Sequence, residues 1–196
     1  MVNKHKLAKI ISRILSPFVV IPIAVGYLLT FYTIPTNSLN TGFIVLFVLT
    51  GFVMTGGVLI YSTLFSKVSD IEIKERTERV PILFSMLPGI WLSVIVSYWY
   101  NQPPLFLCIV LSGAITFTIL TIITLYEKAS LHAGGVTVLY LTLNIIFGWT
   151  YWYSAVAICA VWWARRTLKV HSYQQLAIGT LVPIVIFLTL QSLMLQ

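Results

Sequence analysis

Long apolar runs, separated by short polar or proline-rich breaks, fill almost the whole of this 196-residue chain. Hydrophobic residues make up 59% of it and charged residues only 9%, and the mean hydropathy is +0.96. A helix needs roughly 20 apolar residues to cross a bilayer core of ~30 Å. The sequence therefore predicts an all-α fold, a polytopic transmembrane helical bundle, with no room for a soluble domain.

Seven apolar runs are candidate crossings, in one membrane domain over residues 1–196. The break at 101–104, Asn-Gln-Pro-Pro, predicts a turn because proline interrupts helix hydrogen bonding. The break at 150–153, Thr-Tyr-Trp-Tyr, also fits a lipid interface within a re-entrant hairpin, so six and seven crossings both stay open. The expected crossings are 7–32, 41–66, 81–101, 104–126, 131–149, 151–166 and 172–195.

All Lys, Arg, Asp, Glu and His residues fall on one side of this map. An even number of crossings separates the N-terminal cluster at 4–13 from the charged segments at 67–79, 127–132 and 165–171. Such one-sidedness of all 12 Lys and Arg is a strong positive-inside signal. We therefore expect cytoplasmic charged loops and a cytoplasmic N-terminus, in a bacterial inner membrane. The basic residues are interpreted as topology signals, and no nucleic-acid partner is expected.

Three segments on the charged side carry groups that can bind an anion. The segment 69–81 contains Lys74 and Arg79; by itself it fits a solvated loop with internal ion pairs. Ser130 and His132 lie at the start of an apolar run, where free N–H groups and the helix dipole favour an anion. The segment 162–179 contains Arg165 and His171, and alone it fits a basic turn below an aromatic belt.

Convergence of the three segments favours a site over three separate loops. Even numbers of crossings separate them, so the helices can bring their Lys, Arg, Ser and His side chains together on one face of the membrane. Planar cationic donors beside two imidazoles suit a phosphate monoester.

The spacing resembles that of the type 2 phosphatidic acid phosphatase superfamily, the membrane branch of the vanadium haloperoxidase-like acid phosphatases. The motifs of that family are K-x6-R-P, P-S-G-H and S-R-x5-H-x3-D. Ala164-Arg165, five residues, His171, three residues and Gln175 follow the third motif in spacing. Ala-Ser-Leu-His at 129–132 matches the second at Ser and His, and Arg79-Val-Pro81 resembles the end of the first with one residue inserted. The resemblance covers roughly residues 70–180, and the motif-bearing core spans about 70–195.

The resemblance implies a reaction and a role for each matched residue. His171 would attack phosphorus to give a phosphohistidine, and His132 would protonate the leaving alcohol and later activate water. A metal or other cofactor would not be required. The substrate would be a lipid phosphate or a polyprenyl phosphate or diphosphate, so membrane lipids are the expected partners. The phosphate oxygens would be held by Arg79, Arg165, Ser130 and Lys74, with Gln175 orienting the nucleophile.

Three departures from the family motifs separate this chain from a typical member. Gln175 replaces the acid that orients the nucleophilic histidine, and an amide cannot stabilise imidazolium electrostatically. Glu72 occupies the position of the first-motif lysine, and Leu131 replaces a glycine that lets backbone approach phosphate. The missing acid has four candidate substitutes, which are Asp70, Glu72, Glu75 and Glu78.

These departures leave alternatives to a phosphoric monoester hydrolase. The chain also fits a catalytically silent relative that binds anionic lipid or forms part of a membrane complex or a homo-oligomer. A third hypothesis is a small transporter or flippase. The lack of ionisable groups near mid-membrane counts against it.

Overall fold

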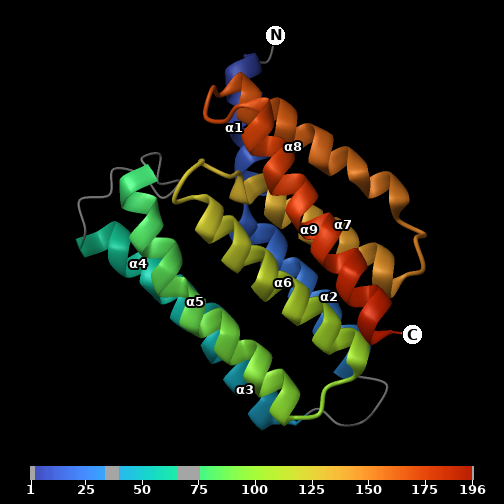
Figure 1. Cartoon of the computed structure of the whole chain (residues 1–196). Helices are drawn as coiled ribbons and strands as arrows, with labels where there is room; N and C mark the ends of the chain where they lie inside the picture. Colours follow the sequence, from blue (N-terminus) through green and yellow to red (C-terminus); the bar gives the residue numbers. More distant parts are fainter. Residues whose placement is uncertain (1–2, 34–39, 66–75, 196) are drawn as a thin grey trace.

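The computed structural model describes residues 3–33, 40–65 and 76–195 of the chain. Within these ranges every regular element is helical (Figure 1), which confirms the predicted all-α bundle. The first half contains α1 (Lys4–Ile14), α2 (Pro17–Thr33), α3 (Thr41–Val48), the π-helix η1 (Leu49–Met54), α4 (Thr55–Phe65) and α5 (Arg76–Trp99). The second half contains α6 (Pro104–Ile123), α7 (Leu131–Ile146), the 3₁₀ turn η2 (Trp152–Ala155), α8 (Val156–Thr167) and α9 (Tyr173–Met194).

Five helical stretches among the described residues are long and apolar enough to cross a membrane, so the chain is an integral membrane protein. The shorter α7 is apolar as well. At 1.5 Å per residue α8 covers only ~18 Å. It follows the turn η2, which lies at the 150–153 break where the sequence also fits a re-entrant hairpin. The five stretches are Lys4–Thr30, Thr41–Ser62, Thr77–Trp99, Pro104–Ile123 and Tyr173–Met194.

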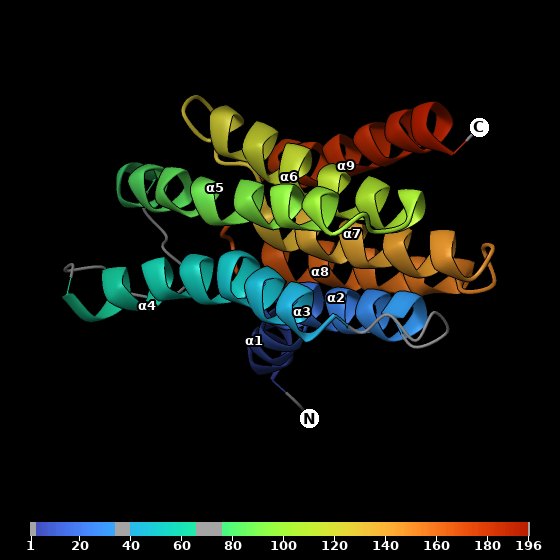
Figure 2. The ribbon, with the colours of Figure 1, turned by 90° about the horizontal axis from the view of Figure 1, so that it is seen from below.

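The helices form a bundle in which α7 is central. It packs between α2 and α9, while α6 packs on α9 and α5, and α5 covers α3, η1 and α4 (Figures 1 and 2). The N-terminal α1 leaves α2 at a break around Ser16 and packs on α8. Two segments far apart in the sequence, α1 and α8, therefore meet at the same end of the bundle.

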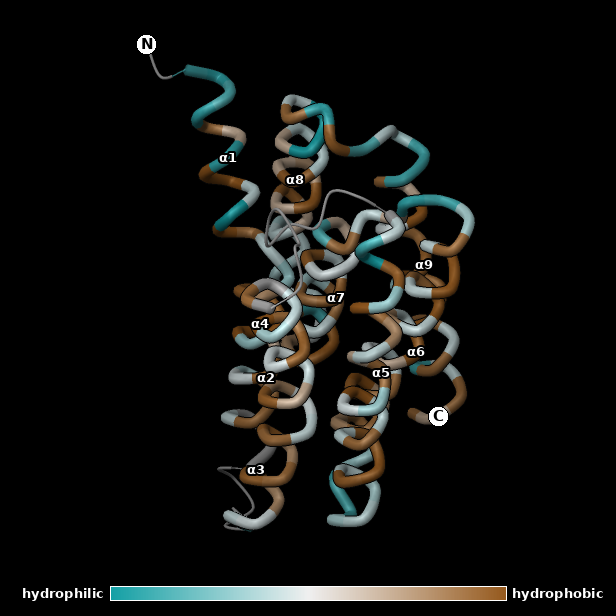
Figure 3. The backbone as a smooth tube through the Cα atoms, turned by 90° about the vertical axis from the view of Figure 1, so that its left-hand side faces the viewer, coloured by the Kyte–Doolittle hydropathy of each residue, from teal (hydrophilic) through white to brown (hydrophobic). Residues whose placement is uncertain are grey.

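Hydrophilic segments gather at that end of the bundle, as the hydropathy colours of Figure 3 show. The start of α1, the α6–α7 connection and the α8–α9 connection all lie there. The opposite, apolar half is held by a buried cluster that includes Phe43, Phe47, Phe106 and Phe187. The one-sided charge pattern of the sequence thus corresponds to one physical end of the molecule for the described residues.

Close packing of α7 on α9 fixes the two histidine-bearing segments relative to each other. A Cβ atom built on Gly179 of α9 would lie 2.4 Å from the carbonyl oxygen of Ser130 and 3.1 Å from Cβ of Ala133. One on Gly135 of α7 would lie 3.1 Å from Cβ of Pro17 in α2. Small residues commonly permit such approach between membrane helices. They hold the start of α7 against the start of α9.

Candidate functional site

Four of the predicted site residues line one end of a single cavity: Arg79, His132, Arg165 and His171. They come from α5, the first turn of α7, the last turn of α8 and the connection to α9. All four are nearly inaccessible to solvent, with exposed fractions between 4% and 8%. Burying two guanidinium groups side by side is costly unless an anion or acceptors compensate them. The cluster therefore has the character of an anion site.

Each arginine is held by a hydrogen bond to another part of the chain. Arg79 donates from Nη2 to the carbonyl oxygen of Ala129, 3.0 Å away, directly before α7. Arg165 donates from Nη1 to Oγ of Ser12 in α1, at 2.7 Å. These bonds tie α5 to α7 and α8 to α1, so the two guanidinium groups have fixed positions.

His132 has one ring nitrogen held and the other available. The backbone of Ser12 hydrogen-bonds to the ring, whereas Nε2 is buried and has no hydrogen-bond partner among the described residues. A buried nitrogen without a partner is costly to maintain and calls for an explanation. In a cavity that also contains His171 and two arginines, a bound ligand oxygen provides one.

His171 is oriented by the capping box of α9. Ser172 caps the helix by accepting from N of Gln175 at 3.1 Å, and its own N–H donates to Oε1 of Gln175 at 3.1 Å. The same Oε1 lies 3.0 Å from Nδ1 of His171. Because an amide oxygen can only accept, Nδ1 of His171 carries the hydrogen and Nε2 of the neutral ring carries a lone pair.

The amide of Gln175 is itself hydrogen-bonded to a carboxylate. Nε2 of Gln175 donates to Oε1 of Glu127, 2.5 Å away, across the connection from α6 to α7. His171, Gln175 and Glu127 therefore form a continuous chain of hydrogen bonds. Position 175 has no acid, but the negative charge of Glu127 lies one side chain further from the ring of His171.

The electrostatic environment of His171 favours the neutral ring. Burial lowers its pKa from the ordinary 6.5 to about 3, and the positive charge of Arg165 acts in the same direction, while the bond to Gln175 partly opposes both. Arg79 and Lys128 add smaller contributions of the same sign as Arg165. The ring of His171 is therefore unprotonated at neutral pH, and an unprotonated imidazole is the form that can act as a nucleophile. A bound phosphate dianion would offset the surrounding positive charge.

Arg13 and Ser16 also line the cavity. The rest of its lining is mostly apolar and continues toward the middle of the membrane. Its volume is about 500 Å³, within the usual range of ligand pockets. The π-helix η1 contributes to the wall, and such segments occur often at functional sites. Among the residues that line the apolar part are Leu28, Phe47, Phe52, Leu83, Ile90, Ile109, Gly113 and Val138.

The remaining predicted site residues have other surroundings. The hydroxyl of Ser130 accepts from N of Ala133 at 3.3 Å as the cap of α7, and Ser130 is not among the residues that line the cavity. Lys74 lies outside the described residues, as do Asp70, Glu72 and Glu75 among the candidate acids. Gln175 contacts His171, as described above.

Two residues that sequence reasoning missed are part of the cluster. Glu127 lies two residues before the second motif, and its charge, between two apolar runs, was the available signal. Ser12 gave no signal, because a single serine in an N-terminal helix has no spacing relationship to motifs more than 100 residues away. Only the packing of α1 on α8 brings it to Arg165.

The arrangement offers a nucleophile, a proton carrier and two fixed cations around one buried space that opens into an apolar cavity. Groups of these kinds can bind a phosphate and take part in phosphoryl transfer. Comparisons of the chain with protein-family models, with curated proteins and with solved structures found no match.

Proposed function

We propose that this protein is a phosphatase that hydrolyses the phosphate ester or diphosphate of a membrane lipid or polyprenyl alcohol through a phosphohistidine. One observation carries the proposal: two histidines and two arginines, brought from four parts of the chain, line the polar end of an otherwise apolar cavity. Polar groups at one end and apolar walls along the rest match a substrate with an anionic head and a hydrocarbon chain. Membership of the type 2 phosphatidic acid phosphatase superfamily is part of the proposal.

The first chemical step transfers the phosphoryl group to His171. The lone pair on Nε2 attacks phosphorus while the bond from phosphorus to the alcohol oxygen breaks. Beside the bound phosphate His132 is an imidazolium, with one hydrogen toward the backbone of Ser12 and the other on Nε2. The leaving oxygen takes the proton from Nε2, His132 becomes neutral, and the alcohol departs along the apolar cavity. Arg79 and Arg165 stabilise the charge that spreads over the phosphoryl oxygens in the transition state.

The second step restores the histidine. Neutral His132 removes a proton from a water molecule as the water oxygen attacks phosphorus, the phosphorus–nitrogen bond breaks, and inorganic phosphate is released. Between the steps the phosphorylated ring of His171 carries a positive charge with its hydrogen on Nδ1. Glu127 supports that charge through Gln175, which supplies part of what a directly bound acid supplies elsewhere.

The charged end of the bundle is proposed to face the cytoplasm. All 12 Lys and Arg of the sequence lie in segments assigned to that side. The N-terminal cluster alone gives the same orientation, independently of any site. Labelling single cysteines introduced at Lys6 and at Gln102 in intact cells, with a reagent that does not cross the membrane, tests this orientation.

The decisive experiment measures both turnover and the covalent intermediate. Purified protein is mixed with ³²P-labelled polyprenyl phosphate and with labelled phosphatidic acid, then quenched in base, where phosphohistidine survives. We expect phosphate release and a labelled protein band, and loss of both by at least about 10³-fold in His171→Ala. His5→Ala, which changes an exposed histidine on α1, is the matched control and should retain activity. Unchanged release by His171→Ala would contradict the proposed nucleophile.

The second candidate function is a catalytically inactive protein that binds anionic lipid or forms part of a membrane complex. The amide at Gln175, in place of an acid, favours it. That residue completes the capping box of α9, a role that needs no catalysis. Absence of turnover on every lipid phosphate tested, with stable co-purification of other membrane chains, would favour this candidate over the phosphatase.

A further inference from the structure

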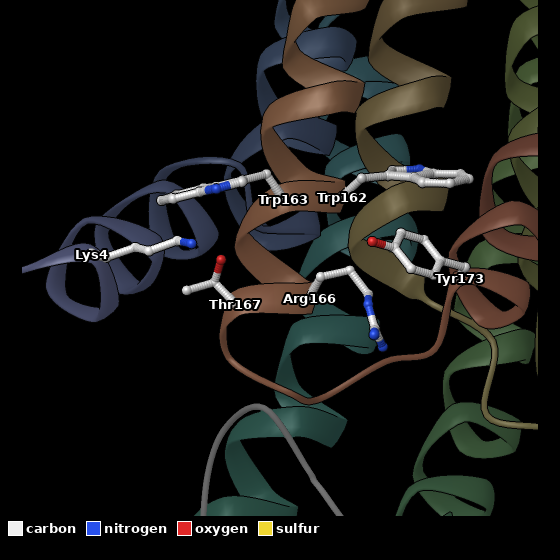
Figure 4. Close-up of a pocket in the computed structure, with 6 residues that line it drawn as sticks. All are labelled: Lys4, Trp162, Trp163, Arg166, Thr167 and Tyr173. Atoms are coloured by element: carbon white, nitrogen blue, oxygen red, sulfur yellow. The ribbon is translucent and has the colours of Figure 1, made fainter.

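A second polar pocket lies outside the bundle, between the ends of α1, α8 and α9. It has a volume of about 440 Å³ and is separate from the cavity that contains the two histidines. Figure 4 shows its six lining residues, with Lys4 from α1, Tyr173 from α9 and the remainder from the last turns of α8. The lining consists of Lys4, Trp162, Trp163, Arg166, Thr167 and Tyr173.

The pocket is cationic, and none of the described residues that line it is acidic. Lys4 is exposed, and in Figure 4 its amine and the hydroxyl of Thr167 point into the same space below the ring of Trp163. The guanidinium carbon of Arg166 lies 4.4 Å from the centre of the Tyr173 ring. Its Nη1 donates to the carbonyl oxygen of His171 at 2.9 Å, which uses one of five N–H groups. The guanidinium is thus held in a fixed orientation while exposed.

The aromatic residues of the pocket are those that favour the headgroup level of a bilayer. The ring of Trp162 is anchored by a 3.0 Å bond from Nε1 to Oγ1 of Thr180. It also lies 6.5 Å from the ring of Tyr173, centre to centre. A rigid pair of amphipathic rings beside two cations places this pocket where lipid phosphates lie.

The adjoining face of α1 is suited to lipid as well. Leu7, Ile10 and Ile14 expose 40%, 44% and 60% of their surface along one side of the helix. The basic residues Lys6, Lys9 and Arg13 are exposed beside them. A helix with this distribution lies at the membrane interface with its apolar side against acyl chains.

We propose that this pocket binds the headgroup of an anionic glycerophospholipid from the leaflet on the charged side. Lys4 and Arg166 hold the phosphate oxygens, Thr167 donates to them, the indole rings pack against the glycerol backbone, and the acyl chains lie along Leu7 and Ile10. Complementary charge and the position of the rings carry this assignment. The lipid is a resident ligand and not a substrate, so the proposal stands whether or not the histidine cluster hydrolyses phosphate esters.

The experiment measures lipid binding directly by native mass spectrometry of the full chain released from detergent. Phosphatidylglycerol and phosphatidylcholine with the same acyl chains are titrated into wild type and the double variant Lys4→Gln/Arg166→Gln. We expect wild type to retain phosphatidylglycerol in preference to phosphatidylcholine. The double variant should bind phosphatidylglycerol about 30-fold more weakly and lose the preference, since each basic residue near anionic lipid contributes a factor of about five.

The matched control is Lys6→Gln/Lys169→Gln, which removes the same charge from the same two regions outside the pocket. It should bind phosphatidylglycerol within about two-fold of wild type. Equal loss in both double variants, or equal affinity of wild type for the two lipids, would overturn the proposal, because diffuse surface charge would then explain the binding. Displacement of the lipid by equimolar glycerol 3-phosphate would also overturn it, since the pocket would then recognise free phosphate.

Substitution of Arg166 can also disturb the loop that contains His171, and this could weaken lipid binding indirectly. A variant at Lys4 alone separates the two effects. Lys4→Gln changes an exposed residue in the first turn of α1 and leaves the bond from Arg166 to His171 in place. We expect about five-fold weaker binding of phosphatidylglycerol in this variant, with an unchanged melting temperature. Wild-type affinity in Lys4→Gln would remove that residue from the site and overturn the proposed two-cation pocket.

Discussion

Polar side chains at the charged end of the bundle bond across helices, whereas most of those in the membrane interior bond back to their own helix. Arg79, Arg165 and Gln175 each reach a different segment of the chain. In the interior, Thr50, Ser97 and Thr137 donate to the carbonyl four residues earlier. Trp91, which donates to Thr118 of the next helix, is an exception.

The contacts of the charged end are specified in more detail than those of the membrane interior. Side chains that donate to their own helix satisfy themselves without fixing a neighbour, so the interior needs only shape and apolarity. The charged end is a connected set in which each member fixes another. A polar end with fixed side chains and an adaptable apolar half suit a ligand with a constant head group and a hydrocarbon chain of variable length.

Removing a cation from the charged end should strongly reduce turnover. Arg165→Ala should lower phosphatase turnover about 10²- to 10³-fold, because a fixed donor to the transferred phosphoryl group is lost. Arg165→Lys should recover only part of the loss, since a point charge replaces a planar fork. Orthovanadate affinity, measured calorimetrically, should fall in parallel. Lys169→Ala, on the exposed loop nearby, is the control, and equal losses in both variants would contradict a specific role for Arg165.

Acid should destabilise the charged end through His171. Its pKa is about 3 in the folded protein against an ordinary 6.5, so between these values the unfolded chain binds the proton that the folded chain does not. The contribution of this group to stability is therefore complete above pH 6.5 and is lost as the pH falls toward 3. We expect the melting temperature in detergent to fall over this interval, with a change in unfolding free energy on the order of a few kcal/mol.

His171→Gln should show a shallower fall of the melting temperature than wild type over the same interval. The exposed His5 provides the control, since His5→Gln should leave the wild-type slope intact. Identical slopes for wild type and His171→Gln would show that His171 is not the group responsible.

Glu127→Gln tests whether charge reaches the nucleophile through Gln175. A glutamine at 127 can still accept from Nε2 of Gln175, so the variant removes the charge and keeps the hydrogen bond. We expect turnover to fall roughly 10- to 100-fold with little change in KM, because the phosphorylated imidazolium loses its counter-charge. Ser172→Ala, which removes the cap of α9 and leaves the relay, should cost stability more than turnover. Turnover by Glu127→Gln equal to wild type would refute the relay.

The sequence predicted the membrane fold and four members of the cluster because both depend on regular spacing. Apolar runs mark helices, and even numbers of crossings place Arg79, His132, Arg165 and His171 on one side. It did not predict Ser12 or the contact of Glu127, because these depend on how α1 and the α6–α7 connection pack. Ser130 was predicted to bind phosphate from its place beside a helix N-terminus, and in the structure that same place makes it the cap.

The smallest expected effect concerns the apolar half and tests its adaptability. Gly113 lines the cavity, and a Cβ atom added to it meets no atom of the described residues within 4 Å, so a larger side chain there enters open space. Gly113→Leu should lower kcat/KM about ten-fold for a long-chain polyprenyl phosphate and leave a short-chain phosphate nearly unchanged, since only the long chain needs the filled volume. Gly57→Leu, in α4 and outside the cavity lining, should affect neither substrate. Equal losses on both chain lengths in Gly113→Leu would mean that the added side chain disturbs the charged end, and that the two halves are not as independent as their hydrogen bonding indicates.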